Sequence, residues 1–174
     1  TQDGERSVTL RRVGDVQALG AVYHVPAGSH PDYPAVDVLT ELLGSEPAGR
    51  LYKALVEPKK ASSAGAFAFQ LREPGVLFAY AEVRKEDSLA VAQRALLETL
   101  DAAASRAPTE EEVARARTTL LKNWELTFNN SERVALELSE WAANGDWRLM
   151  FVHRDRLEKV TPADVQRVAA AYLK

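Results

Sequence analysis

The sequence predicts an α+β domain in which an antiparallel sheet is covered by helices. Two observations lead to this fold class. Strand patterns separated by turn residues fill much of the first half, and every segment from Asp87 onward has helical periodicity. The expected order is two strands, two helices, two strands and about four helices. With 174 residues, 46% of them hydrophobic, the chain can bury a substantial core, so residues 1–174 are expected to form a single domain.

Four segments have the composition of strands and lie between turn signals: 7–13, 16–25, 62–71 and 75–83. Gly14 and Asp15 predict a turn between the first two strands. The Arg-Glu-Pro-Gly sequence of residues 72–75 predicts a turn between the last two, which should therefore form an antiparallel hairpin.

The alternation of residues predicts which face of the third strand is buried. Phe67, Phe69 and Leu71 occupy every second position, as in a strand with one apolar face. We therefore expect these three side chains to lie in the core, against helical residues such as Leu96 and Leu100.

Two helices are expected between the second and third strands. The first covers 35–44 and ends at Gly44, a residue that commonly terminates helices. The second covers 49–57 and ends at Pro58, because proline disfavours helical geometry at the residue before it.

Start signals mark three of the later helices. Thr109 and Glu112 have the spacing of a capping box, in which each side chain accepts a hydrogen bond from the other residue's backbone. Ser131 is expected to cap a further helix. Thr161 followed by Pro162 predicts the start of the last helix.

Composition argues against several classes of protein. A formal net charge of −3 argues against nucleic acid as the main partner, because phosphate binding needs a concentrated basic surface. No window approaches the roughly 18 apolar residues of a membrane span. The chain has no cysteine, which excludes disulfides, thiolate catalysis and zinc sites built on cysteine.

The residue types that usually perform catalysis are scattered. No pair among His24, His30 and His153 has the i, i+4 helical spacing that directs two imidazoles at one metal. The serines lack the context of a nucleophile elbow, and no phosphate-binding glycine pattern occurs. The residues by themselves predict neither a catalytic residue nor a metal ligand on this chain.

Four segments, taken in order, resemble successive landmarks of one protein family: GSHPDYPAVDVLTELLG (28–44), GRLYKALVEPKKASS (49–63), PTEEEVARARTTLL (108–121) and VTPADVQRVAAAYL (160–173). The family is that of the insulinase/pitrilysin-type zinc metallopeptidases, which also includes mitochondrial processing peptidases. The chain is similar to the non-catalytic domain that follows the zinc-binding domain in these proteins.

The resemblance implies that this chain performs no catalysis itself. In the family, zinc is held by an HxxEH helix and a distal glutamate, and two halves enclose an extended peptide. This chain has no HxxEH, so the resemblance places zinc on a companion catalytic domain and leaves this chain inactive. The implied partners are that domain, the second half of the same protein or subunit, and peptide substrates, with a dimer as one arrangement. The implied origin is a longer multi-domain protein, in a bacterial periplasm or alternatively the cytoplasm.

The corner at residues 58–63 departs from the pattern of active members. Such members carry an arginine at the end of this helix and a tyrosine seven residues later, both of which contact substrate. Val56 and Ser63 occupy these positions here, so the resemblance predicts a corner that has lost catalytic assistance. Lys59, Lys60 and Ser63 are then expected to form part of the chamber wall, although two lysines at a corner are also typical of a solvated turn.

Two alternatives stay open on the sequence. One is a structural subunit of the same fold without protease activity, and the other is an unrelated α+β interaction domain. The coding sequence upstream of Thr1 would separate them, because an HxxEH motif there would indicate a peptidase.

Overall fold

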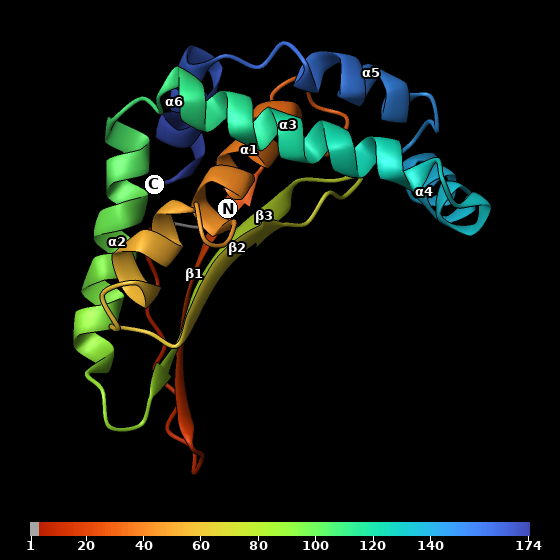
Figure 1. Cartoon of the computed structure of the whole chain (residues 1–174). Helices are drawn as coiled ribbons and strands as arrows, with labels where there is room; N and C mark the ends of the chain where they lie inside the picture. The colour runs from red at the N-terminus through yellow and green to blue at the C-terminus, as the bar shows by residue number, and fades with distance from the viewer. Residues whose placement is uncertain (1–3) are drawn as a thin grey trace.

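The computed structural model describes residues 4–174 and has the predicted α+β architecture (Figure 1). Its elements are β1 (Val16–Val25), α1 (Tyr33–Gly44), the short π-helical turn η1 (Tyr52–Val56), β2 (Ser63–Ala68), β3 (Gly75–Arg84), α2 (Leu89–Ser105), α3 (Glu110–Thr127), α4 (Ser131–Ala143), α5 (Leu149–Leu157) and α6 (Pro162–Tyr172). Five helices therefore follow the last strand, where the sequence predicts about four.

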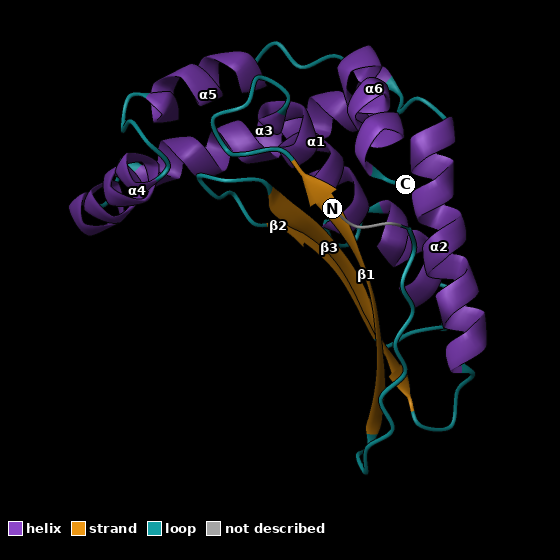
Figure 2. Ribbon diagram, turned by 180° about the vertical axis from the view of Figure 1, so that it is seen from behind, coloured by secondary structure: helices purple, strands orange, loops and turns teal. Residues whose placement is uncertain are grey.

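The three strands form an antiparallel sheet in the order β1-β3-β2. The predicted hairpin is confirmed, since β2 pairs with β3 and Phe67 lies opposite Phe78. The sheet is curved, and the helices gather on its convex side (Figure 2). No helix of residues 4–174 covers the concave side, which we call the open face (Figure 2).

The core lies between the sheet and the helices. α1 runs through its centre and packs against β2, α3, α5 and α6. The side chains of Val36, Leu39 and Leu43 on α1 are buried there. Leu96 and Leu100 of α2 are buried as the periodicity predicts, and both belong to the same core.

The predicted facing of the third strand is wrong. Phe67, Phe69 and Leu71 are 40%, 50% and 49% exposed, and β2 ends at Ala68 before the last two of them. The reason is the close approach of α1. A Cβ atom added to Gly44 would lie 2.5 Å from the backbone nitrogen of Ala66, so the strand can present only small side chains to the helix. Side chains of β2 alternate between the two faces of the sheet as predicted. The face that was expected to be buried is the exposed one.

The predicted strand over 7–13 is also absent. Val8 and Leu10 are 81% and 82% exposed, and this segment has no strand assignment. β1 pairs with β3 along its whole length, and no ladder within residues 4–174 joins β1 to residues 7–13. Alternating apolar residues make a strand only where a neighbouring strand accepts their backbone hydrogen bonds.

Helix starts follow the predictions with one exception. Both hydrogen bonds of the capping box at Thr109 and Glu112 are present, and Thr161 caps α6 just before Pro162. At α4, however, the cap is Asn130 and not Ser131. The Asn130 side-chain oxygen accepts from the backbone nitrogens of the second and third residues after it, at 2.9 and 3.1 Å, a reach that Ser131 lacks from inside the helix.

Candidate functional site

The corner at residues 58–63 caps the C-terminus of the helical segment that contains η1. The backbone nitrogen of Lys60 donates to the carbonyl of Leu55 at 2.8 Å, and that of Lys59 donates to Val56 at 2.9 Å. This pair of bonds is the Schellman arrangement, in which the residue at the position of Lys59 is usually glycine. Lys59 has φ of 61°, in the left-handed region. The corner is therefore a helix stop with a lysine in a strained position.

The residues in the family's arginine and tyrosine positions face structural neighbours. Val56 is half-buried and packs against the core. The Ser63 side chain donates to Glu82 Oε2 at 3.3 Å. Ser62 is bound to the same strand, since its backbone nitrogen and its hydroxyl both donate to the Glu82 carbonyl, at 2.8 and 3.0 Å. Val56 has no polar side-chain atom, and the Ser63 hydroxyl is directed at Glu82.

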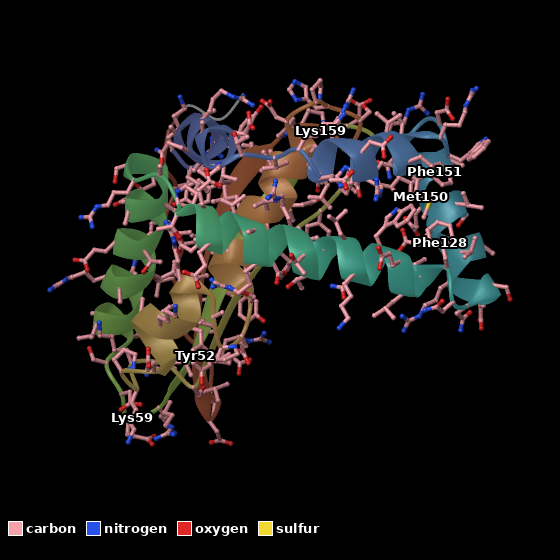
Figure 3. All side chains as sticks on the ribbon, turned by 45° about the horizontal axis from the view of Figure 1, so that its top comes forward. Tyr52, Lys59, Phe128, Met150, Phe151 and Lys159 are labelled. Atoms are coloured by element: carbon pink, nitrogen blue, oxygen red, sulfur yellow. The ribbon has the colours of Figure 1, made fainter. Side chains whose placement is uncertain are left out.

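The structure brings the three predicted wall residues to one corner. Lys59 is exposed and Lys60 is half-buried. Neither lysine forms an ion pair with a carboxylate of residues 4–174. Figure 3 shows Lys59 at the far corner of the molecule from Phe128 and Phe151. The corner can therefore supply positive charge at the surface.

The three histidines lie on different elements, and His30 and His153 each have a polar partner of their own. His153 of α5 is bound to Asp37 of α1, with 2.8 Å between Nε2 and Oδ2. Nδ1 of His30 accepts from the backbone nitrogen of Asp32 at 3.1 Å, in the turn before α1. His24 lies in β1. Within residues 4–174, no group of three His, Cys, Asp or Glu side chains could hold a metal ion.

One charged pair was missed by the sequence analysis. Arg50 Nε and Nη2 donate to the two oxygens of Glu112 at 3.0 and 2.9 Å. The Arg50 hydrogen bonds are the main cause that lowers the pKa of Glu112 from 4.5 to about 2, against a smaller raising effect of burial. The partners are 62 residues apart, so no local pattern could predict them.

Glu112 of this pair also lines a small cavity of about 190 Å³ between α1 and α3. A second carboxylate there, Glu41, has its pKa raised by burial. The two carboxylates do not make an acid–base couple, because both oxygens of Glu112 are occupied. Oε1 accepts from Arg50, and Oε2 accepts from Arg50 and from the Thr109 backbone nitrogen at 2.8 Å. The cavity is part of the packing between α1 and α3 and has a structural role.

The chain is similar to known proteins in sequence and in fold. A model of the peptidase M16 inactive domain matches residues 1–120. The inactive peptidase domain of a candidate zinc protease from Bordetella parapertussis is 40% identical, with a TM-score of 0.86 and coverage of 96% of this chain and 91% of that chain. A candidate zinc protease of Bordetella pertussis Tohama I is 38% identical, with a TM-score of 0.85 and coverage of 92% and 89%.

A longer protein matches as well. The zinc protease PqqE of Helicobacter pylori is 25% identical over 177 residues, a match that includes 99% of this chain. The chain spans only 39% of the length of PqqE. The predicted resemblance is confirmed, because the family model covers more than half of the chain. The chain belongs to the family of peptidase M16 inactive domains.

Proposed function

We propose that this chain is the non-catalytic domain of a zinc metalloendopeptidase, and that it helps to form the closed chamber around peptide substrates. The observation that carries the proposal is that the chain belongs to the inactive-domain family. It is also similar to less than half of a longer zinc protease. Residues 1–174 are then one domain of a longer protein, and zinc lies on a companion domain that carries HxxEH.

Residues 4–174 do not fit a zinc site of their own. His153 Nε2 is already 2.8 Å from Asp37 Oδ2, and His30 Nδ1 already accepts a backbone hydrogen bond. Catalytic zinc needs three protein ligands that converge on one point, and within residues 4–174 no such group exists. No chemical step is therefore assigned to this chain.

The proposed contribution of the chain is to enclose and attract the substrate. Lys59 and Lys60 place positive charge at the corner, which draws acidic peptides at low ionic strength and loses this effect as salt screens it. Ser63 belongs to the same proposed wall, with its hydroxyl bound to Glu82. The corner therefore influences which peptides enter and leaves the rate of bond cleavage to the companion domain.

A second candidate is a scaffold of the same fold in a protein without protease activity. The observation in its favour is that Val56 and Ser63 stand where active members carry the arginine and the tyrosine. Val56 packs on the core, and Ser63 forms a hydrogen bond with Glu82 of β3. In the peptidase reading, the arginine and tyrosine come instead from the opposite half of the protein.

The proposal extends to the setting of the protein. We propose a bacterial periplasmic location, with the cytoplasm as the alternative. The proposed partners are a companion zinc-binding domain, a second half from the same protein or a further subunit, peptide substrates, and a dimer as one assembly. Within residues 4–174, no helix has both the length and the apolar character needed to cross a membrane.

The test uses the complete protein that contains this chain. We expect one zinc ion per catalytic domain and cleavage of unfolded peptides, with cleavage abolished when the glutamate of HxxEH is changed to Gln. Residues 1–174 alone should neither bind zinc stoichiometrically nor cleave peptides. A complete protein without any HxxEH and without peptidase activity would overturn the proposal in favour of the scaffold.

A kinetic test addresses the corner. Loss of a donor to a developing oxyanion typically lowers turnover by about 10²–10³. We expect Ser63→Ala and Val56→Ala to keep turnover of the complete enzyme within about threefold, because neither contributes such a donor. Changing Lys59 and Lys60 together to Ala should weaken the apparent affinity for acidic peptides more than turnover. A hundredfold fall in turnover for Ser63→Ala, with folding intact, would contradict this assignment.

A further inference from the structure

The helix α4 is attached to the rest of the fold by few buried side chains. Of the 13 described residues of α4, one side chain, that of Trp141, is buried. The helix α1, by comparison, buries eight of its 12 residues. Figure 1 shows α4 at the opposite end of the helical layer from α2. A segment with so little buried surface opens at a lower free energy than the core does.

The buried side chains of α4 and the start of α5 lie outside the main core. Trp141 and Met150 are 7% and 1% exposed, but neither belongs to the core between the sheet and the helices. That core resumes at Leu157, the last residue of α5. We call residues 131–156 the α4–α5 unit. Trp141 and Met150 can lose their surroundings without emptying a site in the main core.

One polar pair fastens the α4–α5 unit to the centre of the fold. Nε2 of His153 lies 2.8 Å from Oδ2 of Asp37 on α1, and the two side chains are 11% and 26% exposed. The ring centroid of His153 lies 5.1 Å from that of Trp141 and 6.3 Å from that of Tyr33 on α1. Within residues 4–174, no other side-chain hydrogen bond or ion pair joins the unit to a residue more than four positions outside it.

The contacts of the unit with the end of α3 are more exposed. The ring of Phe151 lies 6.2 Å from that of Trp124 and 6.4 Å from that of Phe128, and Arg154 lies over Trp124 at 5.8 Å. Phe128 and Phe151 are 41% and 39% exposed. Exposed contacts of this kind are weak, whereas removal of one partner from a buried polar pair leaves the other unpaired at high cost. The His153–Asp37 pair is therefore the stronger attachment.

The chain on either side of the unit provides two hinge points. After α5, Nη1 of Arg117 on α3 donates to the carbonyls of Glu158 and Val160, at 3.1 Å each. These bonds hold the chain in place before α6 begins. Between α3 and α4, the backbone nitrogens of Asn129 and Asn130 make long hydrogen bonds of 3.3 Å to the last turn of α3. The α4–α5 unit can therefore swing between these points while α3 and α6 stay in place.

We propose that the α4–α5 unit opens and closes as one body, and that the His153–Asp37 pair is the latch that holds it against α1. In the closed form the unit covers Tyr33, which is fully buried. In the open form His153 and Asp37 are solvated, Trp141 and Met150 are exposed, and the main core is retained. Every contact that forms the latch lies within this chain, so the latch is independent of the proposed function.

The test is amide hydrogen exchange of residues 1–174, followed by mass spectrometry of peptides from each helix. We expect the amides of α4 and α5 to share one opening equilibrium and to exchange at least about 100-fold faster than those of α1 and α2, because the latter open only with the core. Equal protection of α4, α5, α1 and α2 would overturn the proposal without any variant.

Substitutions address the latch itself. His153→Ala and Asp37→Ala should each raise exchange in α4 and α5 at least about tenfold, because each leaves a buried polar group unpaired. The double variant should exceed either single variant by less than about twofold, since both side chains act through one contact. His153→Gln, whose amide can still donate to Asp37, should restore part of the protection. Arg148→Ala removes an exposed ion pair with Asp146 and is the matched control, with exchange within about threefold of the wild type.

The region in which exchange rises decides the result. A rise confined to α4 and α5 supports the latch. A rise of equal size in α1, α2 and α6, or loss of the whole fold in either alanine variant, overturns it, because the latch leaves the main core intact. A rise in only one of α4 and α5 contradicts opening as one body. Unchanged exchange in both alanine variants shows that the pair holds nothing closed.

Discussion

The two faces of the sheet are built from the same strands and differ in what the chain itself lays against them. On the covered face, Leu77, Ala79 and Val83 of β3 are buried beneath the helices. On the open face, the intervening residues Phe78 and Tyr80 stay partly exposed. The larger side chains lie on the more exposed face. Burial on this sheet is therefore set by which face the helices cover and not by the size of the apolar residue.

The largest expected effect is on the covered face. Leu77 is fully buried, so Leu77→Ala should empty a site that the surrounding structure cannot refill. Such substitutions usually cost about 2–5 kcal/mol in the free energy of unfolding. Val22→Ala on the open face of β1, where the side chain is 57% exposed, is the matched control and should cost less than about 1 kcal/mol. Denaturant titration of both variants measures the difference, and equal losses would remove the distinction between the faces.

Carboxylates on the two sides of the sheet should also differ. Glu112, on the helical side, has a folded-state pKa of about 2 against a usual 4.5, mainly because Arg50 donates to it. A lowered pKa stabilises the fold fully above pH 4.5, and this stabilisation is lost as pH falls toward 2. The difference corresponds to about 3 kcal/mol.

Glu112→Gln should therefore remove this part of the pH dependence. Its free energy of unfolding should lie about 2–3 kcal/mol below that of the wild type at pH 7 and approach it near pH 2. Glu82→Gln on the open face is the control, since Glu82 accepts a single side-chain hydrogen bond at 3.3 Å. Parallel curves for Glu112→Gln and the wild type from pH 7 to pH 2 would contradict the role of the Arg50 pair.

The sequence predicts the elements of this fold better than the facing of its sheet. Periodicity identifies β1, the β2–β3 hairpin and the buried stripe of α2 because these signals are local. The phase of β2 depends on the distance between Gly44 and Ala66, which are separated in sequence and meet only in the folded chain. An alternation of aromatic and small residues is compatible with either phase until that distance is known.

The candidate site shows the same limit. The end of the helical segment just before Pro58 could be predicted from the segment itself. The left-handed conformation of Lys59 could not, because nothing in the residue type predicts it. The pairing of Arg50 with Glu112 joins distant segments, and the sequence analysis had no signal for it.

Glycines on the two faces provide a smaller test. A Cβ atom at Gly44 would meet the Ala66 backbone at 2.5 Å, and backbone cannot move aside easily. Gly44→Ala should therefore cost about 1–3 kcal/mol, the usual range for overpacking a core. Gly65→Ala on the open face meets only the end of the Tyr80 side chain, which can rotate away, so it should cost less than about 0.5 kcal/mol. A larger loss at Gly65 than at Gly44 would show that the helix, and not the ring, is the adjustable partner.

Apart from the control variants, the smallest expected effect is that of Phe69→Ala in the isolated domain. A buried phenylalanine usually costs about 3–5 kcal/mol when truncated, which is what the alternation of residues alone would suggest. Phe69 is 50% exposed and follows the end of β2, with its ring edge-on to Phe67 at 5.2 Å. An aromatic pair of this kind contributes about 0.5–1.5 kcal/mol. The exposed half of the ring has little contact with the protein, so its removal costs little. We therefore expect a loss near 1 kcal/mol by denaturant titration. A loss above about 3 kcal/mol would place Phe69 in the core of the isolated domain and reverse the assignment of the two faces.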